Sequence, residues 1–181
     1  MGGAGAPGPG GARAVTAPLV RPATEADLPA VARIYAEAVE DRVATFDTDP
    51  HPPVHFLARL QTGLPMVVAE REGAVIGWAG VLPYSDREVY AGVGLYSVFV
   101  ARAARGSGVG TLILRALVQA SEARGLHKLV GRIFTTNQAS IAVAHACGFR
   151  EVGVHRRHGR LDGRWQDVVV VERLLGDAAA G

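Results

Sequence analysis

The stretch that decides the fold is "RAARGSGVGTLILRAL", residues 102–117. It places Gly106, Gly108 and Gly110 at alternate positions, directly after the apolar run "YSVFVA" (96–101) and directly before an apolar pattern with helical spacing. Glycine permits backbone angles that other residues avoid, and a helix N-terminus offers unpaired amides and the positive end of the helix dipole. This order of elements predicts a site for a phosphate-like anion. The simpler interpretation is a turn needed only for tight strand-helix packing.

Side chains in the same stretch suit an anion. Arg105 can add a charge-assisted contact, and Ser107 and Thr111 can add hydroxyl donors. The mononucleotide pattern requires a Gly-Lys-Ser/Thr run, which is absent here. The dinucleotide pattern G-x-G-x-x-G needs glycine where Thr111 or Ile113 stands. The phosphate is therefore expected to belong to neither kind of nucleotide fold.

Composition favours one soluble domain. The chain has 181 residues, 49% of them hydrophobic and 20% charged, and a net charge of only +2, which gives no reason to expect nucleic acid. Cys147 is the only cysteine, which favours a reducing cytoplasm. It follows an apolar helix and precedes Gly148, which predicts a core filler. No apolar run reaches the roughly 18 residues of a membrane span, so no membrane partner is expected. Residues 1–17 predict a disordered Gly/Ala/Pro-rich leader, 18–176 the domain, and 177–181 a flexible tail.

Apolar periodicity predicts an α+β fold on a mixed sheet without repeats. Thr24 is a candidate N-cap for the first helix, with Asp27 three places on. The expected order is a strand (18–23), a helix (23–41), a short helix (54–61), a hairpin (66–70 and 74–84), a strand (88–101), the glycine turn, a helix to about residue 124, a strand (127–134), a helix (137–149), and two strands (151–157 and 164–174).

Several motifs then carry a family resemblance. Residues 105–110 resemble the R/Q-x-x-G-x-G/A signature of the GNAT superfamily of N-acetyltransferases, and "NQASIAVAHACGF" (137–149) resembles its N-x-x-(S/A)…G-(F/Y) segment. Four further segments resemble the phosphinothricin and methionine-sulfoximine N-acetyltransferases: "RPATEADLPAV" (21–31), "ATFDTDP" (44–50), "LPYSDREVY" (82–90) and "DGRWQDV" (162–168). The sequence is identified as a member of this family. The resemblance implies a single-domain GNAT fold with a splayed strand pair, acetyl-CoA as cofactor, and a homodimer.

The resemblance also implies where acetyl-CoA binds. The diphosphate would contact the glycine turn, and the pantetheine would lie along the preceding strand. Phe99 or Val100 would supply a backbone N–H that stabilises the oxyanion when a neutral amine attacks the thioester directly. The implied cofactor-binding residues are Val98, Phe99, Val100, Arg105, Gly106, Ser107, Gly108, Val109, Gly110, Thr111, Asn137 and Ser140.

The sequence departs from the resembled enzymes at the expected proton-transfer positions. Leu95 stands where they carry a glutamate base, two residues before the Ser or Thr of the strand. Ala144 stands where they carry a His or Tyr acid, with His145 one place along and about 100° round the helix. Gln166 stands where some relatives have His. The usual acid and base are therefore both missing.

Three interpretations of these departures remain open. Tyr96, Glu88 or His145 could act as the base, directly or through a water. The substrate could instead be a weakly basic nitrogen, such as a hydrazine or hydroxylamine in a biosynthetic pathway, that is already neutral. The protein could also bind acyl-CoA without efficient turnover.

The resemblance points to Arg87 as the substrate-binding residue, because that arginine faces the carboxylate or phosphinate of an amino-acid-like amine in the resembled enzymes. A planar guanidinium suits both groups. Tyr84, Tyr90 and Phe46 are candidate pocket walls, although aromatic residues beside a strand are commonly core. Trp165 is expected to be structural. The predicted function is transfer of acetyl to a small amine of the phosphinothricin or methionine-sulfoximine type.

The histidines do not predict a metal site. His155 and His158 could approach His51 or His55, but no cysteine or carboxylate stands at ligand spacing. "HRRHGRLDGR" (155–164) is most simply a solvated β-hairpin. The resemblance places this region near the active site and a homodimer contact.

Overall fold

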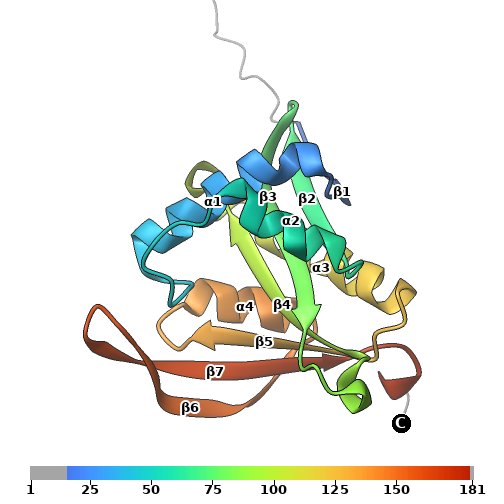
Figure 1. Ribbon diagram of the computed structural model, residues 1–181, viewed down its shortest axis with the longest axis vertical. Coiled ribbons are helices and arrows are strands. Elements are labelled where there is room, and N and C mark those ends of the chain that lie inside the picture. Colours follow the sequence, from blue (N-terminus) through green and yellow to red (C-terminus); the bar gives the residue numbers. More distant parts are fainter. Residues whose placement is uncertain (1–15, 180–181) are drawn as a thin grey trace, which may run out of the picture.

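A mixed sheet runs through the part of the chain that the computed structural model describes, residues 16–179 (Figure 1). Its strand order is β1-β2-β3-β4-β5-β7-β6. Only β4 and β5 pair in parallel within these residues, and the other neighbours are antiparallel. The strands are β1 (Leu19–Pro22), β2 (Met66–Arg71), β3 (Ala74–Pro83), β4 (Val93–Val100), β5 (Lys128–Phe134), β6 (Arg150–Leu161) and β7 (Arg164–Leu174).

Helices cover both faces of this sheet. α1 (Leu28–Asp41) and α2 (Pro53–Gln61) lie on one face, and α3 (Val109–Ala123) and α4 (Gln138–Ala146) lie on the other (Figure 1). Short 3-10 turns are η1 (Glu25–Asp27), η2 (Glu88–Tyr90), η3 (Arg102–Ala104) and η4 (Gly176–Ala179). The predicted α+β class and single mixed sheet are therefore confirmed. No helix among residues 16–179 is long and apolar enough to cross a membrane.

Thr24 caps the first helical segment as predicted, but residues 25–27 form the 3-10 turn η1 and the α-helix starts at Leu28. Thr24 and Asp27 form a capping box, in which the Thr24 amide donates to Asp27 Oδ2 over 2.8 Å. The η1 turn occupies the residues between this cap and α1. Arg21 donates two hydrogen bonds of 2.8 Å to the same carboxylate, and they hold the pKa of Asp27 at about 2. The buried face of α1 consists of apolar residues: Leu28, Val31, Ala32, Ile34, Tyr35, Ala38 and Val39.

Successive side chains of the central strands point to opposite faces of the sheet, so they pack into two separate cores. Side chains of β4 such as Tyr96 pack toward α3 and α4, whereas Phe99 packs toward α1 and α2. Cys147 is 3% exposed in the first of these cores, as predicted for a core filler. The two cores cover β4 on both faces. A ligand can therefore reach β4 only along its edge toward β5.

The predicted splayed pair is confirmed by the register of β4 and β5. Their pairing begins at Val93 with Lys128 and ends at Leu95 with Val130. β4 nevertheless continues to Val100 and β5 to Phe134. The two strands therefore diverge over their C-terminal halves.

Some predicted boundaries differ from the observed ones. The strand expected from residue 88 starts at Val93, because Glu88–Tyr90 form η2 with local hydrogen bonds such as Ala91 N to Glu88 O. The predicted solvated hairpin is present, but β6 extends to Leu161 through irregular pairing between His155 and Gly159. Trp165 is 49% exposed and lies beneath Arg160, whose Cζ is 4.2 Å from the ring centroid.

The termini bear on the predicted domain limits. Residues 1–15 of the predicted leader and residues 180–181 of the predicted tail lie outside the described residues. Within the described part of the tail, Asp177–Ala179 belong to the η4 turn. The first and last strands, β1 and β7, fall within the predicted domain of residues 18–176.

Candidate active site

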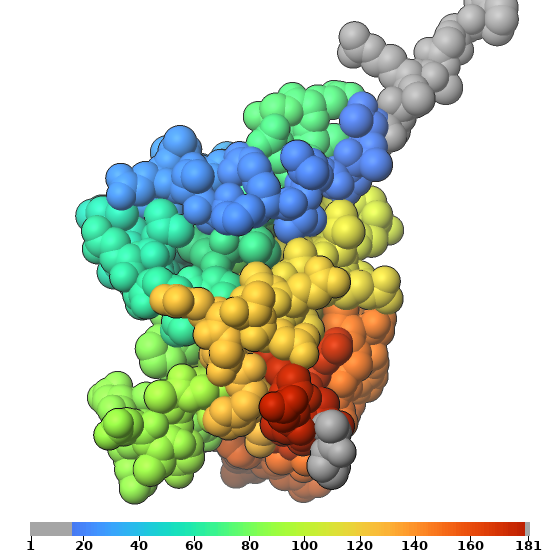
Figure 2. Space-filling view, turned by 90° about the vertical axis from the view of Figure 1, so that its right-hand side faces the viewer, coloured from blue at the N-terminus to red at the C-terminus, as the bar shows by residue number. Residues whose placement is uncertain are grey.

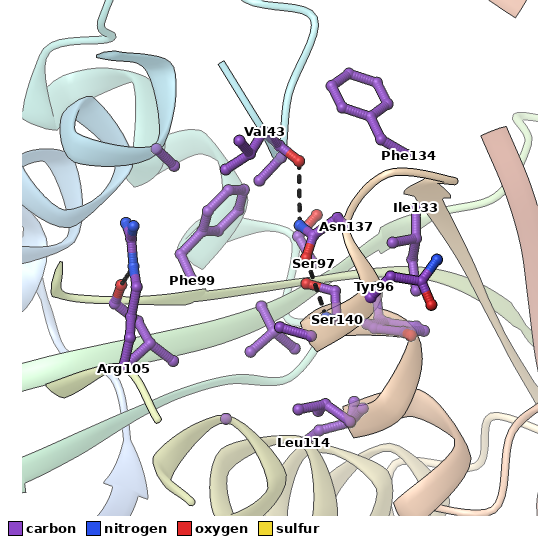
Figure 3. A pocket seen from close by; sticks show the side chains of 18 of the residues that line it. Val43, Tyr96, Ser97, Phe99, Arg105, Leu114, Ile133, Phe134, Asn137 and Ser140 are labelled. Carbon is purple, nitrogen blue, oxygen red and sulfur yellow. Dashed lines mark hydrogen bonds between the residues drawn. The ribbon is translucent and has the colours of Figure 1, made fainter. Parts of the chain in front are cut away.

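The divergence of β4 and β5 opens a cavity of about 550 Å³ (Figure 3). Its floor comes from residues 96–100 of β4, and one side from residues 132–134 of β5. The glycine turn contributes Arg105 and Gly106, and the start of α4 contributes Asn137 and Ser140. The cavity thus joins the N-termini of two helices to the unpaired edge of a strand.

The glycine turn has the backbone that its sequence predicts. Gly106 and Gly108 have φ angles of +74° and +81°, which side-chain-bearing residues rarely adopt. Gly108 is the N-cap residue of α3 and leaves the first amides of this helix without a side-chain cap. Nothing lies within 4 Å of a Cβ built on either glycine, so the space in front of the turn is open. An anion can therefore reach the α3 amides.

The remaining predicted residues of the turn lie close by but differ in their contacts. A Cβ on Gly110 would lie 3.5 Å from Val143, an ordinary van der Waals contact. The Ser107 hydroxyl donates to the Ala104 carbonyl over 2.6 Å, so it braces the turn in this structure. Val109 is buried and Thr111 is half-buried in the first turn of α3.

Arg105 is anchored rather than free. Its Nε donates to the Val100 carbonyl over 3.1 Å, and its Nη1 lies 2.6 Å from Asp41 Oδ2 at the end of α1. Arg102 contacts the same carboxylate over 2.8 Å. Hydrogen bonds from Arg102 and Arg105 lower the pKa of Asp41, so this carboxylate stays ionised. The turn is thereby tied to α1 across the mouth of the cavity.

Asn137 forms a second tie. Its Oδ1 accepts the Ser140 amide over 3.1 Å as the N-cap of α4, and its Nδ2 donates to the Val43 carbonyl over 3.1 Å (Figure 3). The predicted pair Asn137 and Ser140 is thus brought together at the cavity edge. Their contact with a cofactor stays a prediction.

The three candidate bases lie in different places. Tyr96 is buried and lines the cavity. His145 is exposed on α4, where its Nε2 lies 3.2 Å from Glu151 Oε1. Glu88 is exposed on η2. Leu95 is half-buried and pairs with Leu82 and Val130. Of the three candidates, only Tyr96 is among the cavity-lining residues.

Three of the four predicted substrate residues form one cluster. The rings of Tyr84 and Tyr90 are 5.8 Å apart, and Arg87 Cζ lies 5.6 Å from the Tyr90 centroid. Figure 2 shows their segment, the β3–β4 connection in light green, protruding from the surface. The fourth residue, Phe46, lies elsewhere and packs edge-on against Phe134, a cavity residue, with centroids 4.7 Å apart.

Several site residues were not predicted from the sequence. Asp41, Arg132 and Phe134 carry no motif, and their roles depend on contacts between distant segments. Gly131 does carry a signal, because a glycine inside a strand often marks a close approach by another group. Here that group is the ring of Tyr96, since a Cβ on Gly131 would lie 2.5 Å from Tyr96 Cε1.

The site fits coenzyme A in two respects. The open α3 amides suit a diphosphate, and the backbone of β4 beyond Leu95 lacks a strand partner on the β5 side, which suits the amide groups of pantetheine. No group of three or more metal-binding side chains occurs in the described part of the chain. Residues 31–149 match the model of the acetyltransferase (GNAT) family.

The chain belongs to this family. It is 36% identical over 161 residues to a phosphinothricin N-acetyltransferase of Alcaligenes faecalis, covering 86% of this chain and 82% of the relative. It is 34% identical over 161 residues to an L-methionine sulfoximine/L-methionine sulfone acetyltransferase of Pseudomonas paraeruginosa, covering 86% and 94%.

A solved structure agrees with the fold of this GNAT acetyltransferase. The phosphinothricin acetyltransferase of Sinorhizobium meliloti, crystallised in complex with acetyl-CoA, superimposes with a TM-score of 0.85 at 34% identity and 91% coverage of both chains. The family uses acetyl-CoA as acetyl donor. The GNAT protein described here is accordingly an acyltransferase, which argues against the interpretation of binding without turnover.

Proposed function

We propose that this enzyme transfers the acetyl group of acetyl-CoA to the primary amine of a small amino-acid-like substrate, of the phosphinothricin or methionine-sulfoximine type. The observation that carries the proposal is the Tyr84–Arg87–Tyr90 cluster. It presents an exposed guanidinium at the N-terminal end of β4, the strand whose C-terminal half forms the cavity floor. The names of the relatives support the same substrate class.

The cofactor half of the site performs binding and orientation. Acetyl-CoA supplies an acetyl thioester when bound. The α3 amides and the turn at Gly106 and Gly108 would hold its diphosphate, and the free edge of β4 would hold its pantetheine. The Val100 carbonyl accepts a hydrogen bond from Arg105 over 3.1 Å, so this carbonyl is already occupied in the structure.

The acceptor half recognises an acid group. Arg87 is exposed, and a planar guanidinium binds carboxylates and phosphinates with two parallel hydrogen bonds. Tyr84 hydrogen-bonds through its amide to the Val93 carbonyl over 3.2 Å, which fixes the cluster to the start of β4. Tyr96 lies three residues further along the strand than Val93, a distance of roughly 10 Å. A small substrate can therefore lie between Arg87 and the cavity.

The test is release of the CoA thiol with a panel of amines. Phosphinothricin and methionine sulfoximine should be turned over, and Arg87→Ala should raise KM for them at least tenfold while leaving the Kd of CoA unchanged. Amines without an acid group should show no such difference between wild type and R87A. Arg33→Ala on α1 is the matched surface control. Equal KM values in wild type and R87A would overturn the substrate assignment.

A weakly basic nitrogen is the second candidate substrate. The observation that favours it is the cavity lining, which contains neither a carboxylate nor an imidazole among the described residues. A weakly basic hydrazine or hydroxylamine nitrogen needs no base to become neutral at pH 7. Faster thiol release with such compounds than with amino acids, across the whole pH range, would favour this alternative over the first.

We also propose that the enzyme is a cytoplasmic homodimer. The β6–β7 hairpin presents Val152, Val154 and Trp165, which are 53%, 48% and 49% exposed. Exposed apolar residues of this kind support a contact between copies. The single thiol of Cys147 is free, as in a reducing compartment. Light scattering should give twice the chain mass, and Val154→Asp should reduce it to the monomer.

A further inference from the structure

We infer that Tyr96 is the catalytic acid that protonates the departing sulfur of CoA. This inference rests on the proposed function and names a residue for it. The position on α4 that the sequence comparison marks for an acid is Ala144, which is fully buried and has no proton to give. Tyr96 belongs to the same buried cluster but projects from β4.

The position of Tyr96 is the point where the two strands separate. Leu95 and Val130 form the last pair of the parallel ladder, so Tyr96 and Gly131 are the first residues beyond it. The phenol ring lies against Gly131. A Cβ there would lie 2.5, 2.6 and 2.7 Å from Tyr96 Cε1, Cζ and Oη. Because Gly131 has no side chain, the hydroxyl end of Tyr96 fits against it, at the point where β4 and β5 separate.

The surroundings of Tyr96 favour its protonated form. Its ring packs on Phe149 with centroids 4.8 Å apart, and burial raises its pKa above the ordinary value of 10. The titratable group that acts on it is Cys147 after α4, and the other titratable side chains of the cavity are Arg132 on β5 and Arg105 in the turn. Burial raises the pKa of the Cys147 thiol as well, so this neighbour is neutral. The hydroxyl therefore keeps its proton at neutral pH and is unsuited to act as a base.

Other cavity residues cannot replace Tyr96 as an acid. The titratable side chains that line the cavity are Tyr96, Arg105 and Arg132. A guanidinium does not lose a proton in the accessible pH range. A phenol whose pKa is raised by burial is still a stronger acid than the aliphatic hydroxyls of Ser97 and Ser140.

The proposed step balances as follows. The amine nitrogen forms a bond to the carbonyl carbon, and the carbon–sulfur bond breaks with its electron pair on sulfur. Tyr96 Oη donates its proton to that sulfur. The nitrogen releases its proton to water, and the tyrosinate regains a proton from water. The products are the amide and CoA thiol.

Binding measurements test this role independently of turnover. Tyr96→Phe keeps the ring over Gly131, so the fold and Tm should be unchanged. A hydroxyl that donates to sulfur favours the thiolate, so the thiol pKa of bound CoA, followed by thiolate absorbance, should be lower in wild type than in Y96F. Desulfo-CoA should bind both proteins equally. Identical thiol pKa values in the two complexes would overturn the inference.

Kinetics provide the second test. Y96F should lower kcat about 100-fold, the usual effect of removing a general acid, with the Kd of CoA within twofold of wild type. Fluorotyrosine at position 96 should restore activity and move the alkaline limb of the kcat profile to lower pH. Undiminished kcat in Y96F, or an unmoved limb with fluorotyrosine, would refute the role. A wild-type protein that binds CoA but acetylates no amine would instead refute the proposed function.

Discussion

Arg105 Nη1 lies 2.6 Å from Asp41 Oδ2, so the turn in front of α3 is bonded to the last residue of α1. The two residues are 64 positions apart. Arg105 is also the side chain expected to meet the diphosphate of CoA, and it already holds an anion. We therefore expect Asp41 to compete with the cofactor for this guanidinium.

Substitutions of Arg105 and Asp41 should therefore change CoA affinity in opposite directions. Arg105→Ala should weaken CoA binding roughly tenfold, since it removes a charge-assisted hydrogen bond. Asp41→Asn should tighten CoA binding a few-fold, because a negative charge beside the diphosphate is lost. Titration calorimetry measures both. Glu40→Gln is the control, because Glu40 pairs with Arg102 but not with Arg105. Weaker binding by D41N would mean that Asp41 positions Arg105 instead.

Substitutions of two glycines in the turn should affect CoA affinity differently. Gly108→Val should weaken CoA binding at least tenfold, because a β-branched residue at φ +81° costs about 1–2 kcal/mol and displaces the α3 amides. Gly110→Ala should bind CoA almost normally, since its Cβ finds 3.5 Å of space to Val143. Equal affinities for G108V and wild type would contradict this account of the turn.

The contact between Tyr96 and Gly131 predicts that two glycine substitutions differ in their effect on stability and activity. Gly131→Ala should lower both Tm and kcat, because the new Cβ would lie 2.5 Å from the buried Tyr96 ring and force it to move. Gly153→Ala, on the exposed strand β6, has nothing within 4 Å of its Cβ and should change neither. Thermal unfolding and thiol release check both variants. Full activity in G131A would show that the ring position is unimportant.

Acid stability tests the start of α1. Hydrogen bonds from Arg21 hold the pKa of Asp27 at about 2, below its ordinary value of 3.8. This carboxylate therefore stabilises the fold at pH values above 4, and the stabilisation is lost as the pH falls toward 2. Asp27→Asn should cost roughly 1–2 kcal/mol in urea unfolding at pH 7. The difference should shrink steadily below pH 4. A pH-independent difference would exclude the ionised Asp27 as its source.

Local sequence signals predicted the helices, the strands and the glycine turn. Thr24 and Asp27 marked the first helix, and Gly106 and Gly108 marked a backbone that the structure confirms. These features depend on residues close together in the chain. The register at which β4 and β5 separate depends on packing across the sheet, and no motif at Leu95 or Val130 announces it.

Contacts between distant segments set the limit of the prediction. Asp41 and Val43 contact the cavity residues Arg105 and Asn137 only because the end of α1 lies close to them in the fold. The Tyr96–Gly131 contact likewise joins two strands that never pair at that point. Such pairs follow from tertiary structure. The sequence therefore predicts the glycine turn better than the part of the site that would bind the amine substrate.

The most direct test of the central claim is hydrogen exchange of the wild-type protein with and without CoA, read by mass spectrometry. The cleft between β4 and β5 should gain protection at residues 96–111 and 136–143, and the β1–β2 pair should not change. Protection confined to other segments, or none at saturating CoA, would contradict the placement of the acyl donor in this cleft.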